Sequence, residues 1–226
     1  MISLDATCAE SYPGLTIGYI ALRDVSGQSP ETGIALDLRR AELEAELRRR
    51  YSSLDRSVLA ALAPFPAYAA YYKRFKKTYH VLLQLESVAL KGRAIASPGG
   101  LVQAMFMAEL ESCLPTAGHD ADAIGLVRVR AADGTEEFVG LDGQDRRLKA
   151  GDLHMADAEG VISSVIYGPD SRTRIHPGTR RVLYTVYGVP GVDPREVEIH
   201  LARLEEYSLM AAPNASVEER RVFTAS

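Results

Sequence analysis

The stretch LVQAMFMAELESCLPTAGHDADAI, residues 101–124, predicts a helix that carries polar groups to the end of a sheet. Four of its residues recur at helical spacing on one face: Val102, Met105, Phe106 and Glu109. The pattern ends near Pro115, and three titratable side chains precede an apolar, strand-like run: His119, Asp120 and Asp122. We therefore expect a site where this helix meets the strand that follows it.

The sequence on either side of this stretch predicts an α+β fold. Residues 15–22 are rich in β-branched and aromatic residues and predict a strand, whereas residues 41–51 and 81–91 predict helices. After residue 122, short apolar runs alternate with Asp-Gly turns, which favours antiparallel strands in a meander or a sandwich. Asp193, followed by a proline and a glutamate, is typical of the start of a closing helix.

We expect a single domain over residues 1–212, because there is no internal repeat, low-complexity tract or clear linker. It would consist of an N-terminal strand and helices at 1–100, a sheet-rich half at 101–190 and a closing helix at 193–211. The polar residues 213–226 are expected to form a loose tail.

Composition limits the function classes. The apolar share of 46% is that of a globular protein, and the net charge of -4 argues against bulk electrostatic binding of nucleic acid, so any RNA contact must come from a local patch. Cys8 and Cys113 have no zinc or redox spacing, and neither a metal nor a cofactor is expected. There is no signal peptide and no apolar run of about 18 residues, so we expect a cytoplasmic protein without a membrane partner.

After the break at Pro64 and Pro66, the sequence predicts a helix that carries both aromatic and basic side chains. Four aromatic residues fall at i, i+3, i+4 and i+7: Tyr68, Tyr71, Tyr72 and Phe75. Four basic residues accompany them: Lys73, Arg74, Lys76 and Lys77. Rings that stack on bases beside phosphate-binding cations would suit RNA. An aromatic stripe at helical period, however, more often packs in the core, with the basic residues on the solvent-exposed side of the helix.

Two further groups of residues are candidates for chemistry. His119 could act as a general base, or Asp120 and Asp122 could hold a metal, although short acidic loops after helices are common. The loop YGPDSRTRIHPGT at 167–179 concentrates polar side chains between two strands: Asp170, Ser171, Arg172, Arg174, His176 and Thr179. Its arginines and glycine backbone would suit an anion, and equally the loop could be polar because it is a wet hairpin tip.

The order of these features resembles the B3/B4 domain of the beta subunit of phenylalanyl-tRNA synthetase, and more closely its free-standing relatives. The resemblance rests on a helix that leads through a proline to Asp-x-Asp, then Leu-Asp-Gly at 141–143, Ala-Asp at 156–157, and a glycine turn before a threonine at 168–179. It implies a compact α+β fold with an unusual, antiparallel-rich β-sandwich. In the synthetase this domain hydrolyses tyrosine wrongly joined to the phenylalanine tRNA.

The resemblance also implies positions for the pocket. The family's Thr-Asn pair falls at Met105 and Phe106, its histidine at Ala117, and its glutamate on the last strand at Thr185, so most of its polar pocket groups are replaced. His119 lies two positions after the family histidine and is the catalytic candidate. The expected substrate pocket is formed by Met105, Phe106, Ala117, Gly168, Asp170, Ser171, Thr179 and Thr185.

Two functions follow from the sequence. The first is a tRNA-binding protein that hydrolyses mischarged aminoacyl-tRNA in trans and contacts phosphates through Lys73, Arg74, Lys76, Lys77, Arg172 and Arg174. The alternative is a non-catalytic binding module whose pocket holds a small amino-acid-like molecule.

Overall fold

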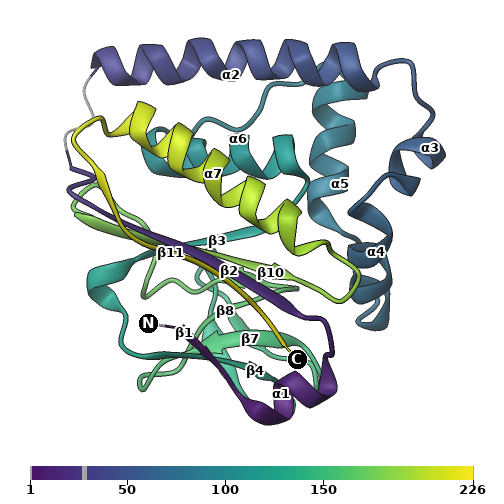
Figure 1. Ribbon diagram of the computed structural model, residues 1–226, viewed down its shortest axis with the longest axis vertical. Coiled ribbons are helices and arrows are strands. Elements are labelled where there is room, and N and C mark those ends of the chain that lie inside the picture. Colours follow the sequence, from purple (N-terminus) through teal and green to yellow (C-terminus); the bar gives the residue numbers. More distant parts are fainter. Residues whose placement is uncertain (1, 27–29, 226) are drawn as a thin grey trace.

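The structure is a computed structural model that describes residues 2–26 and 30–225. It confirms the expected α+β class, because helices cover one side of two stacked β-sheets (Figure 1). The helical layer lies uppermost in Figure 1, a four-stranded sheet lies beneath it, and a five-stranded sheet forms the far side. Within the described residues, no helix has both the length and the apolar character needed to cross a membrane.

The four-stranded sheet has the order β11-β2-β10-β3 and is antiparallel throughout. Its strands are β2 Thr16–Arg23, β3 Thr116–Asp120, β10 Arg181–Gly188 and β11 Ser216–Thr224. The expectation of a loose tail after residue 212 is wrong, since β11 pairs with β2 along its whole length. Backbone hydrogen bonds hold this edge strand, which explains why its mostly polar sequence did not reveal it.

The five-stranded sheet has the order β1-β4-β7-β8-β9, with β1 parallel to β4 and the other pairs antiparallel. The strands are β1 Ile2–Leu4, β4 Val127–Ala131, β7 Leu153–Ala156, β8 Val161–Ser164 and β9 Gly168–Pro169. A separate hairpin is formed by β5 Glu137–Val139 and β6 Asp145–Arg147.

The helices α6 and α7 lie directly on the four-stranded sheet, and α2 lies above them (Figure 1). The hydroxyl of Tyr184 on β10 donates to the carbonyl of Leu101 on α6 at 3.0 Å, which ties the sheet to this layer. The helices are α1 Ala6–Ser11, α2 Pro30–Tyr51, α3 Arg56–Ala61, α4 Phe65–Arg74, α5 His80–Leu85, α6 Gly100–Ser112 and α7 Pro194–Ala211. A π-helical segment, η1 Glu86–Leu90, continues α5, and a short 3-10 turn, η2 Ala121–Ala123, follows β3.

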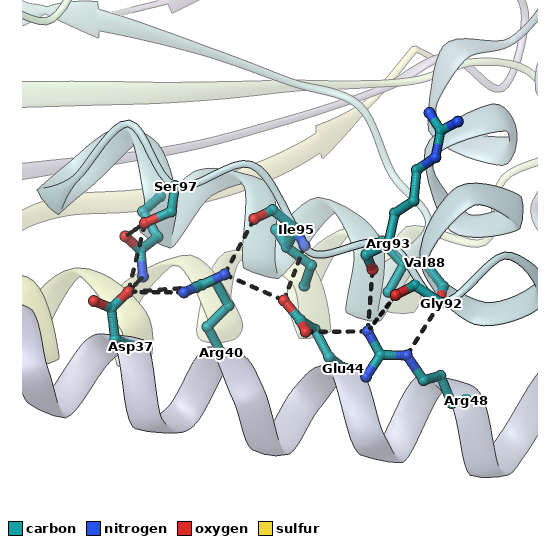
Figure 2. Close-up of polar contacts among 10 residues, drawn as sticks. Asp37, Arg40, Glu44, Arg48, Val88, Gly92, Arg93, Ile95 and Ser97 are labelled. Atoms are coloured by element: carbon teal, nitrogen blue, oxygen red, sulfur yellow. Dashed lines mark hydrogen bonds and ion pairs between the residues drawn. The ribbon is translucent and has the colours of Figure 1, made fainter.

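Helix α2 begins well before the predicted residue 41, and its polar face is more than a solvated surface (Figure 2). Glu44, only 7% exposed, accepts a hydrogen bond from the amide of Ile95 at 2.9 Å and pairs with Arg40 and Arg48. Arg48 in turn donates to three backbone carbonyls in η1 and in the segment after it: those of Val88, Gly92 and Arg93. This network fixes the chain segment that leads into α6.

Candidate functional site in a cavity beside helix α6

A cavity of about 180 Å³ lies where α6 meets β3 and β9. The predicted face of α6 forms one wall, with Val102, Met105, Phe106 and Glu109 all facing the cavity. The opposite walls include Ala117, Gly168, Pro169 and Tyr187. Its surface is mainly apolar, so it suits a small ligand whose buried part is mainly apolar.

The local sequence explains how this wall forms. Gly99 and Gly100 have positive φ values of 94° and 50°, a conformation that glycine adopts without strain, and they turn the chain into α6. On β3, an added Cβ at Gly118 would lie 3.1 Å from Met105 Sδ and 2.9 Å from Ile175 Cδ1. Glycine at this position therefore allows Met105 to pack closely against the strand.

Glu109 is the polar group at the cavity that the sequence did not single out as a site residue. It is 3% exposed, and its Oε1 accepts a hydrogen bond from the Thr116 amide at 2.7 Å. Burial raises the pKa of its carboxyl to about 8, and the Thr116 amide offsets only part of that rise. The carboxyl is therefore mostly protonated at neutral pH. The available signal was an acidic residue on an otherwise apolar helix face.

The structure brings together half of the expected pocket residues. Met105, Phe106, Ala117 and Gly168 line the cavity. The remaining four do not line it: Asp170, Ser171, Thr179 and Thr185. They belong instead to the loop at 170–179 and to the interior of β10, as their contacts show.

The buried polar residues of that second group lie inside the protein, away from the cavity. Asp170 accepts hydrogen bonds from the amide and hydroxyl of Thr173. The hydroxyl of Thr179 donates to Asp120 at 3.0 Å. Thr185 lies opposite Ala117 in the β3–β10 register, is fully buried, and has no hydrogen-bond partner for its hydroxyl among the described residues.

His119 lies on β3 beyond the cavity and does not line it. Its Nδ1 is 2.8 Å from Thr173 Oγ1. Because that hydroxyl donates to Asp170, Nδ1 carries the proton and donates to Thr173. Burial, with a smaller effect of Arg172, lowers the pKa of His119 to about 3. The loop at 170–174 covers the ring, so the imidazole is neutral and enclosed, and is not presented to a substrate in the cavity.

The acidic residues after His119 are also engaged. Asp120 lies 2.9 Å from His176 Nε2, and Asp122 forms an ion pair with Arg181 at 3.1 Å. Over residues 2–26 and 30–225, no group of three histidine, cysteine or acidic side chains is arranged to hold a metal ion. The acidic loop thus fastens η2 and the 176–181 segment together.

The aromatic stripe of α4 forms part of the core, as the alternative interpretation had it. Tyr68, Tyr71, Tyr72 and Phe75 are each at most 5% exposed. The hydroxyls of Tyr68 and Tyr72 donate to the carbonyls of Tyr187 and Val165. These rings hold α4 against the sheets and are not available to stack on bases.

The predicted phosphate-binding residues separate into two groups. Arg172 forms ion pairs with Asp157, Glu159 and Asp170 and donates to the carbonyl of Ala123, so it stabilises the protein internally. Arg174 is exposed and donates to Ser171. By contrast, the cations around the end of α4 are exposed: Lys73, Arg74, Lys76 and Lys77.

Lys149 joins these four cations, which sequence reasoning did not anticipate because it is distant in the chain. A second cavity, of about 350 Å³, is lined by Arg74, Phe75, Lys76, Lys149 and Ala150. We call Lys73, Arg74, Lys76, Lys77 and Lys149 the basic cluster. In the part of the chain that the structure describes, none of the five forms an ion pair with a carboxylate.

Comparison with known proteins gives matches to one synthetase subunit. The beta subunit of phenylalanine--tRNA ligase from Mycoplasma genitalium is 35% identical over 69 residues, which cover 30% of this chain and 9% of that subunit. The subunit from Tropheryma whipplei is 39% identical over 75 residues, 33% of this chain and 8% of that subunit. The matched segment thus spans less than a tenth of either relative.

A crystal structure of an N-terminal fragment of the phenylalanyl-tRNA synthetase beta subunit from Pyrococcus horikoshii aligns with 98% of this chain and 53% of that chain, at a TM-score of 0.48 and 13% identity. Residues 99–208 match the B3/4 domain family. This region, which contains α6, β3 and most of the cavity wall, is thus similar to the B3/4 domain and to the beta subunit of phenylalanine--tRNA ligase.

Proposed function

We propose that this chain binds the aminoacylated end of a tRNA, with the aminoacyl group in the α6 cavity and nearby phosphates on the basic cluster. The observation that carries the proposal is the position of an apolar cavity next to a group of cations without carboxylate partners. Elsewhere, arginines such as Arg172 and Arg181 are paired with acidic side chains. In a chain of net charge -4, such a local group of cations without carboxylate partners suits phosphates.

Residues of the basic cluster lie close to residues at or next to the lining of the cavity. The Nζ atom of Lys77 lies 4.7 Å from the centre of the Tyr167 ring, and the next residue, Gly168, lines the cavity. His80, three residues after Lys77, also lines it. A nucleic acid bound on the cluster would therefore have its end close to the mouth of the cavity.

The size of the cavity limits what enters it. A volume of about 180 Å³ is below the 300–1,000 Å³ that is typical of pockets for drug-sized ligands. It suits the side chain and amino group of one amino acid, while the terminal nucleotide stays outside against the cluster.

The proposal includes hydrolysis of a mischarged aminoacyl-tRNA in trans. In that reaction a water oxygen attacks the ester carbonyl carbon, the ester C–O bond breaks, and the ribose oxygen leaves with a proton. Gln84 lines the cavity, and its amide has no hydrogen-bond partner in the described structure, so it is available to hold the water. The family's polar pair is replaced by Met105 and Phe106, which makes hydrolysis the step that needs the direct assay.

Gel shifts with charged and uncharged tRNA at several salt concentrations test the binding step. Replacing Lys149 with alanine should lower the slope of log K against log salt by about 0.7 to 0.9, the effect of one lost phosphate contact. Arg220→Ala, which removes one exposed cation from β11, is the matched control and should leave the slope unchanged. Binding that is insensitive to salt and to Lys149→Ala would refute the assignment.

Deacylation of a panel of mischarged tRNAs, followed with purified protein, tests the hydrolytic step. We expect a rate above the uncatalysed rate for one aminoacyl group, and we expect it to be lost when Ala117→Leu fills the cavity.

A non-catalytic binding module for an amino-acid-like molecule is the second candidate function, and the mainly apolar walls of the cavity favour it. Thermal stabilisation by such a molecule, with no tRNA binding, would support that function instead.

A further inference from the structure

Glu109 has an unusual position among the residues that line the α6 cavity. It is the one carboxylate among them, and the described lining contains no lysine or arginine. Thr116 occupies its Oε1, while Oε2 has no hydrogen-bond partner in the described structure. A 97% buried carboxyl with one free oxygen at an apolar cavity requires a polar partner to offset its desolvation.

Among the described residues, the groups around Glu109 supply no cation near neutral pH. His80 on α5 and Tyr187 on β10 also line the cavity. Desolvation lowers the pKa of His80, and burial raises the pKa of Tyr187. His200 on α7 contacts Thr116 Oγ1 at 2.7 Å, and burial lowers its pKa to about 3. All three groups are neutral where Glu109 titrates.

We propose that the Glu109 carboxyl binds the ammonium group of an aminoacyl ester, so that the cavity selects esterified over free amino acids. The proposal rests on the proposed function and specifies its substrate class. A buried ammonium group needs a carboxylate partner, and Glu109 provides one. A free amino acid would also bring a carboxylate, which would lie in a cavity without a cation and near the charge of Glu109.

The proton balance follows from the pKa of Glu109, which burial raises to about 8. At pH 6.5 the free protein holds a neutral carboxyl group. Because a bound ammonium group stabilises the carboxylate, the carboxyl proton passes to solvent on binding. About one proton is released for each ester bound, because Glu109 is the one carboxylate in the described lining of the cavity.

Isothermal titration calorimetry at pH 6.5 tests the inference with three matched probes for each side chain. For alanine, leucine and phenylalanine these are the methyl ester, the free amino acid and the N-acetyl methyl ester. Only the first has an ammonium group and no carboxylate. The ester of the best-fitting side chain should bind about tenfold or more tightly than its two counterparts. Two buffers with different ionisation enthalpies give the number of protons released.

Glu109→Gln keeps an acceptor for the Thr116 amide and should remove both the preference for the ester and the proton release. Glu111→Gln is the control, because Glu111 lies on the same helix but pairs with Arg203 and contacts Tyr207, away from the cavity. Circular dichroism of both variants verifies folding. Equal binding of ester and N-acetyl ester, binding without proton release, or an unchanged preference in Glu109→Gln would each overturn the inference.

The outcomes separate this inference from the proposed function. Salt-sensitive tRNA binding that needs Lys149, together with ester binding that is indifferent to Glu109, would remove only the role of Glu109. Ester selection that depends on Glu109 without any binding of tRNA would remove the tRNA proposal and keep the role of Glu109.

Discussion

Replacing Glu109 with glutamine removes a buried titratable group from α6 with little change in shape. The glutamine oxygen can still accept the hydrogen bond that Glu109 Oε1 receives from the Thr116 amide at 2.7 Å. The substitution therefore isolates the free energy linked to the carboxyl proton. The expected effect is a stability difference between wild type and variant that depends on pH.

The direction of this pH dependence follows from the raised pKa of Glu109. Between the ordinary value of 4.5 and about 8, the folded protein holds the Glu109 proton while the unfolded chain has released it. Rising pH thus favours unfolding, so the stability linked to this proton is complete below pH 4.5 and is lost as pH approaches 8. At about 1.4 kcal/mol per pH unit, wild type loses on the order of 3 kcal/mol by pH 7 relative to Glu109→Gln.

Urea unfolding at half-unit steps from pH 4.5 to pH 8.5, for wild type and Glu109→Gln, measures this difference. The two unfolding free energies should converge at the acid end and separate steadily up to about pH 8, with the variant more stable. Glu111→Gln should run parallel to wild type in the upper part of this range. Parallel curves for wild type and Glu109→Gln would show that Glu109 titrates normally, and would refute the argument from burial.

Three other predictions concern the fold around the site. Glu44→Ala should lower the unfolding free energy by about 2–3 kcal/mol in urea, because it leaves the amide of Ile95 without an acceptor and two arginines without their shared partner; a loss below 0.5 kcal/mol would contradict this. Gly118→Ala should displace Met105 into the cavity and lower the free energy of unfolding by about 1–3 kcal/mol. Calorimetry should then show weaker ester binding. An unchanged affinity would show that the strand moves instead. Deletion of residues 213–226 should abolish cooperative thermal unfolding, because it exposes the edge of β2; a native melting curve would mean that β11 is dispensable.

The sequence alone determined the features that depend on neighbours in the chain. The helical period at Val102, Met105, Phe106 and Glu109 predicted the face of α6 that lines the cavity, because side chains three and four residues apart share one side of a helix. The aromatic stripe of α4 likewise supported the core interpretation that the structure shows. The ordered motifs also pointed to the family that residues 99–208 match.

Tertiary structure decided what depends on partners distant in the chain. Residues 216–224 form an edge strand because β2 offers them backbone hydrogen bonds, and a mostly polar sequence does not reveal such pairing. His119 is enclosed by a loop more than fifty residues away, and Arg172 is occupied by carboxylates whose positions only the fold sets. Lys149 reaches the cations of α4 in the same way. The raised pKa of Glu109 follows from burial, a property of the packed molecule. Its place on the helix face was predicted by the sequence.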